Sequence, residues 1–186
     1  MRASTSRAPS ESADPVGFIV ALLVRFPEIA TLVSHPTEGT LTLSFAVAKK
    51  LDRTTQREVR DLILEHVRSI GALMAEPLER LEVACEADEA MTFVRLTRDV
   101  RTITREELQM LTTLVAHRFE GLLVKSPLSE DEALDDDPGA QDDSVDFALD
   151  ALRDPSQQKG LVGYREEKRV MVYFVSARKK AKARGR

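Results

Sequence analysis

The chain has 186 residues and a mass of 20.7 kDa, enough for one well-buried domain with appendages. It is 42% hydrophobic and 31% charged, lacks Trp and has a net charge of −4, a composition typical of a globular protein with an aliphatic core. A single cysteine excludes an intramolecular disulfide and a cage of cysteines around a metal. The apolar stretch at residues 16–24 is too short to cross a membrane, and the acidic residues before it argue against a signal peptide. We therefore expect a cytoplasmic protein without membrane contact.

The first expected element is a helix, followed by a strand pair. Residues 1–12 are rich in Ser, Ala and Arg without an apolar period, so we expect them to be disordered. The Asp-Pro pair at residues 14–15 is typical of a helix start, and the Phe-Pro pair at residues 26–27 ends the helix. Strands are expected over residues 29–34 and 40–48, joined as a hairpin by a loop that contains Pro and Gly.

Two segments that lie 48 to 49 residues apart look like copies of one strand-and-helix unit. Each has alternating side chains, typical of a strand, followed by a Thr-x-x-Glu box, typical of a helix start. The boxes begin at Thr55 and Thr104 and predict helices over residues 55–74 and 104–119. A duplication of this kind indicates an architecture and not a chemistry. The matching segments are Thr42–Val47 with Thr55–Leu62, and Ala90–Arg95 with Thr104–Leu111.

From Thr40 to Val124 the expected order of elements is β-α-β-β-α-β. The inner strand pair is expected at residues 78–86 and 91–98, and a short closing strand at residues 122–124. This order is that of the ferredoxin-like split βαβ arrangement, in which two helices cover one face of an antiparallel sheet. We therefore predict an α+β fold, with an internally duplicated ferredoxin-like domain over residues 13–126 that has an added helix and strand at its N-terminus.

The last third of the chain is polarised in charge. Residues 129–154 contain one basic and 11 acidic side chains, a net charge of −10, whereas residues 155–186 contain 10 basic and two acidic ones, a net charge of +8. Acidic residues with Pro and Gly predict a flexible acidic linker over residues 127–143. An amphipathic helix capped by Ser144 and a β-hairpin are expected over residues 144–176, followed by a basic tail over residues 177–186.

The predicted helix and hairpin need a surface to pack on, because an isolated hairpin is marginally stable in water. Two alternatives stay open. The region folds back onto the open face of the sheet, or it docks on a partner protein by helix-in-groove or strand-addition contacts. The side chains expected to contact a partner are Val145, Leu149, Leu152, Tyr164, Val170, Val172 and Phe174.

The basic tail is a candidate polyanion-binding segment, because contacts to phosphates give affinity without sequence choice. One alternative is that the tail is a disordered end that only solubilises the chain. Another is that the acidic linker pairs with the tail and masks it from polyanions. The strands of the expected domain offer Phe45 and Phe93 as core aromatics, so base stacking on an exposed sheet is disfavoured. The candidate residues are Arg178, Lys179, Lys180, Lys182, Arg184 and Arg186.

No catalytic, metal or cofactor site is legible in the sequence. We interpret Cys85 as a structural thiol, and Asp52 and Asp99, near corresponding turns of the two copies, as turn-forming and ion-pairing residues rather than an anion site. The histidines lack the spacing of metal ligands, and we interpret them as surface or turn residues rather than as metal or acid/base groups. They are His35, His66 and His117.

These observations favour a non-catalytic cytoplasmic interaction or regulatory protein. Its contacts with a protein partner or a polyanion are expected in the C-terminal helix, hairpin and tail, with sequence-nonspecific nucleic-acid binding as one form. A small-molecule-sensing domain is the first alternative. An enzyme with a site assembled across a dimer from Asp52, Asp99 and His35 is the second. A homodimer is plausible from the open sheet face and the duplication.

Overall fold

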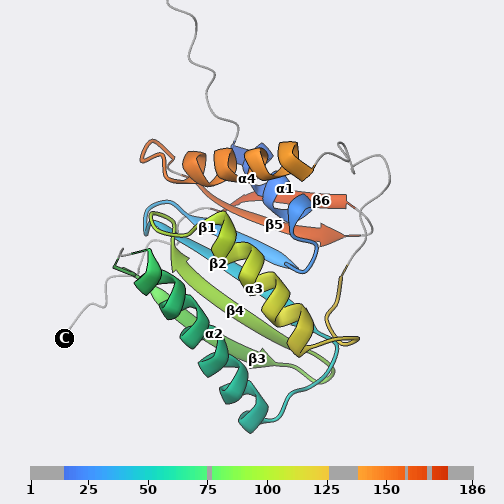
Figure 1. Ribbon diagram of the computed structural model, residues 1–186. Coiled ribbons are helices and arrows are strands. Elements are labelled where there is room, and N and C mark those ends of the chain that lie inside the picture. Colours follow the sequence, from blue (N-terminus) through green and yellow to red (C-terminus); the bar gives the residue numbers. More distant parts are fainter. Residues whose placement is uncertain (1–14, 75–76, 126–137, 158, 167–168, 176–186) are drawn as a thin grey trace, which may run out of the picture.

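A computed structural model of the chain describes residues 15–74, 77–125, 138–157, 159–166 and 169–175. Within these ranges four helices and a six-stranded antiparallel sheet form an α+β fold, with strand order β3-β4-β2-β1-β5-β6. The helices cover one face of the sheet, and the strands lie uncovered by helices on the other (Figure 1). In chain order the elements are α1 (Pro15–Arg25), β1 (Thr31–His35), β2 (Thr40–Val47), α2 (Arg53–Leu73), β3 (Leu81–Ala87), β4 (Thr92–Asp99), α3 (Arg105–Arg118), α4 (Pro138–Leu152), β5 (Gly160–Glu166) and β6 (Arg169–Val175).

The first half of the fold follows the sequence closely. The helix expected after the Asp-Pro pair is α1, and four of its apolar side chains, Phe18, Ile19, Leu22 and Leu23, are buried in the core. The hairpin β1–β2 turns at Gly39, whose φ of 63° lies in the left-handed region that glycine adopts without strain. Strand β2 is buried along nearly its whole length, because β1 and β4 flank it on both sides. The expected strand pair and second helix are β3, β4 and α3.

The fourth strand of the ferredoxin-like order is where the prediction was wrong. Residues 122–124 form no strand, and Leu123 makes a single antiparallel bridge with Val47. Along residues 40–44 of β2 the neighbouring strand is β1, with Leu32 opposite Leu43, and residues 122–124 bond only to the end of β2. A strand has only two edges, and a short hairpin loop brings β1 to β2 at little entropic cost. The strand order β3-β4-β2 is thus completed by the N-terminal strand.

The two helix starts differ, although their sequences match. Thr104 caps α3 as predicted, since its hydroxyl accepts a hydrogen bond from the Glu107 amide at 3.2 Å. In the first copy the cap is Asp52, whose carboxylate accepts from the Thr55 amide at 2.9 Å, so α2 begins two residues before the predicted start at Thr55. Asp is a preferred residue at the helix N-cap, where its backbone adopts an extended conformation. Here Asp52 lies upstream of the Thr-x-x-Glu box.

Helix α4 corrects the predicted linker. It begins at Pro138, six residues before the expected cap Ser144, so residues 138–143 belong to a helix. Proline suits the first turn of a helix, where its missing N–H would have no partner in any case. Asp142 is ion-paired with Arg25 at 3.0 Å, which fastens the acidic stretch to α1. The remainder of the predicted linker, at residues 127–137, lies outside the described residues.

The C-terminal hairpin joins the main sheet as β5 and β6, α4 packs on α1, and neither lies across the open face. Strand β5 pairs with β1, with Gly163 opposite Leu32, and β6 pairs with β5. Helix α1 packs over β5 and β6, and α4 packs against α1. The core therefore runs without a break from the α2–α3 half of the molecule into the α1–α4 half.

Candidate partner-binding surface

Strand β6 forms one edge of the sheet. It pairs with β5 on one side, and none of the described strands lies along its other side. Residues 170–175 are Val-Met-Val-Tyr-Phe-Val, a run without any charged side chain. An edge strand of this composition presents free N–H and C=O groups to another strand, and natural edges usually avoid this with charges, proline or a bulge.

The side chains of β6 alternate between the two faces of the sheet. Val172 lies opposite Gly163, beneath α1, so the even-numbered residues point to the helix side. Phe174 on this side is 58% exposed. On the open face Tyr173 is 49% and Val175 39% exposed. Both faces of this edge thus leave large apolar side chains in contact with solvent, an arrangement that marks interaction surfaces.

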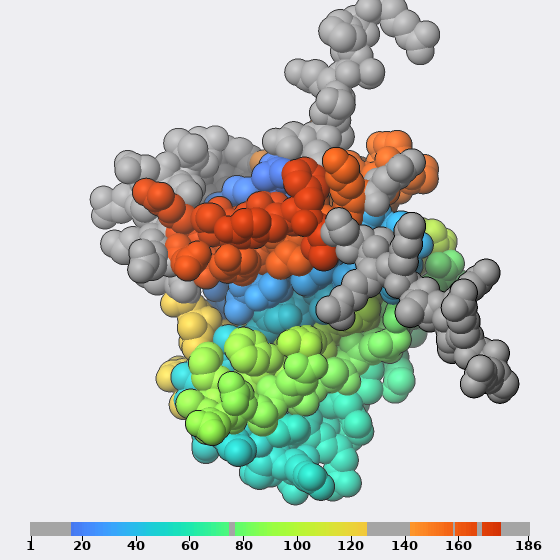
Figure 2. Space-filling model, turned by 180° about the vertical axis from the view of Figure 1, so that it is seen from behind, coloured from blue at the N-terminus to red at the C-terminus, as the bar shows by residue number. Residues whose placement is uncertain are grey.

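The open face behind β6 continues the apolar character of the edge. The rings of Tyr164 and Tyr173 stack at 5.9 Å between centroids with an interplanar angle of 13°. On the helix side, the Lys159 ammonium lies 5.3 Å from the Phe174 ring centroid. Figure 2 shows β6 and β5 in red and orange at one end of this face, with β1 and β2 in blue and β3 and β4 in green beyond them. Aromatic side chains fixed by such contacts are effective binding groups, because they lose little entropy when a partner covers them.

The opposite edge of the sheet, β3, is of a different kind. Its open-face side chains include Glu82 and Glu86, both exposed. Glu82 accepts a hydrogen bond from Arg80 at 3.1 Å, and Glu86 pairs with Arg95 at 2.6 Å. Charges on an edge strand discourage another strand from pairing with it. The β3 edge therefore carries charges that discourage strand addition, whereas residues 170–175 of the β6 edge carry none.

The side chains predicted to contact a partner divide into two groups. Val145, Leu149 and Leu152 on α4 are 0%, 2% and 7% exposed and fill the protein's own core. They belong to the core that α4 shares with the rest of the molecule, so they are not accessible to a partner. The hairpin residues Tyr164, Val170 and Val172 are half-buried, and Phe174 is exposed.

Sequence reasoning missed Tyr173 and Val175, which are exposed on the open face. The signal was present in the continuous apolar run, but the side of the sheet that each residue occupies depends on the pairing with β5. The predicted polyanion-binding residues of the tail, from Arg178 to Arg186, lie outside the described residues.

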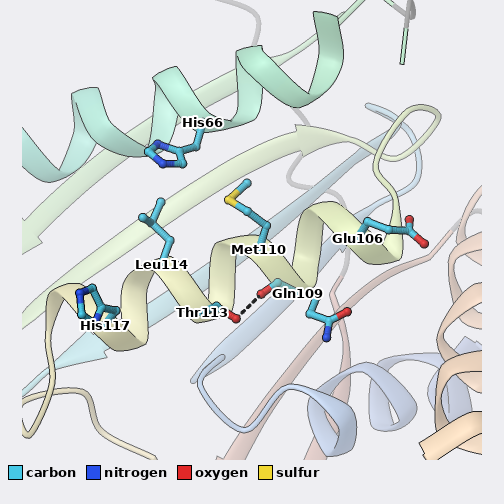
Figure 3. A pocket seen from close by; sticks show the side chains of 7 residues that line it. All are labelled: His66, Glu106, Gln109, Met110, Thr113, Leu114 and His117. Atoms are coloured by element: carbon cyan, nitrogen blue, oxygen red, sulfur yellow. Dashed lines mark hydrogen bonds between the residues drawn. The ribbon is translucent and has the colours of Figure 1, made fainter. Parts of the chain in front are cut away.

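A second feature is a groove of about 550 Å³ between α2 and α3 (Figure 3). Met110 and Leu114 point from α3 toward α2, and His66 of α2 lies across from Leu114. His66 Nδ1 is 2.8 Å from the carbonyl oxygen of Leu62, so the imidazole bonds to its own helix. The groove is thus apolar at its base and polar along its rim. Its lining residues are His66, Glu106, Gln109, Met110, Thr113, Leu114 and His117.

The most buried charged cluster is centred on Arg98, which is fully buried. Its guanidinium donates to both carboxylate oxygens of Glu107, at 2.7 and 2.9 Å, and also to Asp99 and Thr102. Burial disfavours the charge on Arg98, but the bonds to Glu107 and Asp99 outweigh it and raise the pKa of Arg98. This planar, two-pronged pairing satisfies the charges within the cluster and joins β4 to α3.

Asp99 belongs to this cluster, and both of its carboxylate oxygens accept hydrogen bonds within the protein. Its carboxylate accepts hydrogen bonds from the Thr102 amide at 3.1 Å and from the Arg80 amide at 3.2 Å. Burial alone would raise the pKa of Asp99, but the bonds from Thr102 and Arg80 and the charge of Arg98 lower it below its usual range. The ion-pairing interpretation of Asp99 agrees with these contacts.

The other candidates from the sequence have local structural contacts. Asp52 caps α2, and the amide and hydroxyl of Thr55 lower the pKa of Asp52. His35 is half-buried at the end of β1. Burial raises the pKa of Cys85, whose Sγ donates to the carbonyl of Gln56 at 3.6 Å. A thiol with a raised pKa is a poor nucleophile at neutral pH, which favours the structural interpretation.

Within the described part of the chain, no group of three or more His, Cys, Asp or Glu side chains is placed to hold a metal ion. No helix in that part is both long and apolar enough to cross a membrane. Comparison of the chain with protein-family models, with curated proteins and with solved structures gives no match.

Proposed function

We propose that this chain is a non-catalytic cytoplasmic interaction protein that binds an extended segment of a partner protein along β6. The partner would add a strand to the sheet, with main-chain hydrogen bonds providing affinity. Side chains of the partner would lie beside Phe174 on one face and beside Tyr173 and Val175 on the other. The observation that supports this proposal is the uncharged, partly exposed edge at β6, in contrast with the glutamate-bearing edge at β3.

The test is binding of fluorescent seven-residue extended peptides that vary in apolar alternation and flanking charge. The edge-blocked variant carries Tyr173→Lys and Phe174→Lys. The matched control carries Leu73→Lys and Met74→Lys, which add the same charge at exposed apolar positions on the α2 side, at the other end of the sheet. Peptides should bind the wild type and the control alike, and bind the edge-blocked variant at least about tenfold more weakly. Equal binding to all three chains would refute the proposal.

The basic tail is proposed to add affinity for polyanions, including nucleic acid without regard to sequence. Six Lys and Arg residues within 178–186 would release counterions on binding, so affinity should fall steeply as salt rises. Fluorescence anisotropy with RNA and duplex DNA, on the full chain and on one truncated after Ala177, measures this. Binding that is unchanged by the truncation would contradict a role of the tail.

A small-molecule-sensing role is the second candidate, and the α2–α3 groove is the observation that favours it. Met110 and Leu114 give an apolar base, and His66, Gln109 and Thr113 give polar groups at the rim, as in many ligand sites. A metabolite that binds there should raise the melting temperature in a saturable manner at constant salt. Leu114→Arg, which places a charge in the groove, should abolish the shift.

No observation on the described residues favours the hypothesis of an enzyme site assembled from Asp52, Asp99 and His35. The first two are engaged in a helix cap and a buried ion cluster.

A further inference from the structure

We infer that a second copy of this chain occupies the β6 edge, in an antiparallel β6–β6 pair that joins two six-stranded sheets into one. The inference rests on the proposed strand-binding edge, and it assigns that edge in the free protein to a second copy of the chain. A two-fold axis through the centre of the strand makes the same surface serve both protomers, as in most homodimers. The resulting sheet would be continuous across the two chains, with the helices of both copies on the same face.

The sequence of β6 is complementary to itself in this register. With the axis at Val172, the central residue of Arg169–Val175, each Val172 lies opposite the same residue of the other copy. Val170 then lies opposite Phe174 on the helix side, and Met171 lies opposite Tyr173 on the open face. These central pairs are apolar, whereas the outermost pair places Arg169 opposite Val175 at each end. Pairs of an aromatic with an aliphatic side chain stabilise antiparallel strands. The pairing would cover Tyr173 and Phe174, and Val175 would lie beside the aliphatic stem of Arg169.

The β6 edge could also be occupied by the β3 edge of a second copy, but the charges on β3 disfavour this contact. That contact would place Glu82 and Glu86 beside Met171, Tyr173 or Val175 on the open face. Each carboxylate would lose water and its contact with Arg80 or Arg95 without gaining a partner. A β6–β3 contact is also head-to-tail, so it would leave free edges and build open chains of protomers. The β6–β6 pair closes on itself.

The pair has a functional consequence. An extended segment of a different protein and the second copy would compete for the same edge, so binding of that segment should rise as the dimer dissociates. Because the edge is uncharged between Val170 and Val175, dimerisation should persist at raised salt, whereas polyanion binding by the tail should not.

The first measurement is the mass of the wild-type full chain by light scattering and sedimentation over a dilution series. We expect a dimer that dissociates on dilution. A wild type that stays monomeric at every concentration overturns the inference.

The second measurement tests the register by charge exchange. One chain carries Met171→Lys and Tyr173→Lys, and the other carries Met171→Glu and Tyr173→Glu. In the proposed register each altered chain places like charges opposite one another, so self-association should weaken by more than about 100-fold. Mixed in equal amounts, the two chains should pair one to one, because each Lys then lies opposite a Glu. Two folded variants that do not associate on mixing, or that each still dimerise, would overturn the register.

Cross-linking tests the same register without charged substitutions, which is needed if the double Lys or double Glu variants unfold the hairpin. In a Cys85→Ser background, a chain with Met171→Cys is mixed with a chain with Tyr173→Cys under oxidising conditions. Residues directly opposite in an antiparallel pair are close enough for a disulfide. The mixed disulfide should form faster than with a Leu73→Cys control on α2. An equal rate for the control contradicts the β6 pair.

The failure of this inference can be told apart from the failure of the proposed function. Peptide binding at β6 by a chain that is always monomeric would remove the dimer and keep the strand-binding edge. A β6–β6 dimer that binds no peptide, even at dilutions where it is monomeric, would keep the dimer and remove the partner-binding function.

Discussion

Gly163 of β5 lies directly beneath Ile19 of α1. A Cβ atom at position 163 would lie 2.2 Å from Ile19 Cγ2 and 2.9 Å from Leu23 Cδ1, both far closer than van der Waals contact. Ile19 and Leu23 are fully buried, so neither side chain has free space to move into. The absence of a side chain at Gly163 therefore lets α1 pack on the hairpin, and this contact helps hold β5 and β6 on the sheet.

The first prediction concerns this close approach. Gly163→Ala should lower the free energy of unfolding by about 2–3 kcal/mol, because the added methyl group must displace α1 or force Ile19 from its rotamer. Urea unfolding measures the loss. In an Ile19→Ala background the same change should cost clearly less, since Cγ2 is gone. Strict additivity of the two changes in the double mutant would show that the contact does not limit the packing.

The second prediction concerns the buried pair of Arg98 and Glu107. Glu107→Gln should lower the free energy of unfolding by about 3–5 kcal/mol, because it leaves a fully buried guanidinium with one carboxylate partner, Asp99, in place of two. The neighbouring exposed Glu106 gives the control, and Glu106→Gln should stay within about 0.5 kcal/mol of wild type. Both are measured by chemical denaturation at neutral pH. A similar effect of the two changes would contradict the role assigned to Glu107.

The third prediction is a pH dependence set by Asp99. Its pKa in the folded protein lies below the ordinary value of 3.8, so the ionised carboxylate stabilises the fold above that value. The stabilisation is lost as the pH falls through the lowered folded-state pKa. Asp99→Asn should be less stable than wild type at neutral pH, and the gap should narrow in acid, below about pH 4. Unfolding curves between neutral pH and about pH 3 measure it, and a gap that widens on acidification would contradict the assignment.

The fourth prediction separates two possible starts of α2. If Asp52 is the cap, Asp52→Ala should lower the melting temperature more than Thr55→Ala does. If the Thr-x-x-Glu box at Thr55 began the helix, the order would be reversed.

For α3, Thr104→Ala should lower the free energy of unfolding by about 1 kcal/mol and Thr104→Ser by much less, because Ser keeps the hydroxyl that accepts from the Glu107 amide.

The position of the candidate surface shows where sequence reasoning reached its limit. The apolar run at residues 170–175 predicted a strand that is covered on both faces. The strand is β6, but its residues Tyr173, Phe174 and Val175 are exposed. Which of its residues face solvent depends on its register with β5, and a shift of one residue would exchange the two faces. The α2–α3 groove was not predicted, because its base is built from Met110 and Leu114 on one helix and its wall from another.

Most local elements follow from periodicity, turn residues and proline: α1, the hairpin β1–β2, the strand pair β3–β4, α3 and the apolar hairpin β5–β6. Periodicity, turn residues and proline act over a few residues, so each element can be recognised from its own stretch of sequence. Long-range packing was needed to select β1, rather than residues 122–124, as the strand that pairs with β2, and to place β5 beside β1. Such choices depend on competition between distant segments for the same strand edge and on steric fit, as at Gly163 under Ile19, and neither is encoded in any one stretch of sequence.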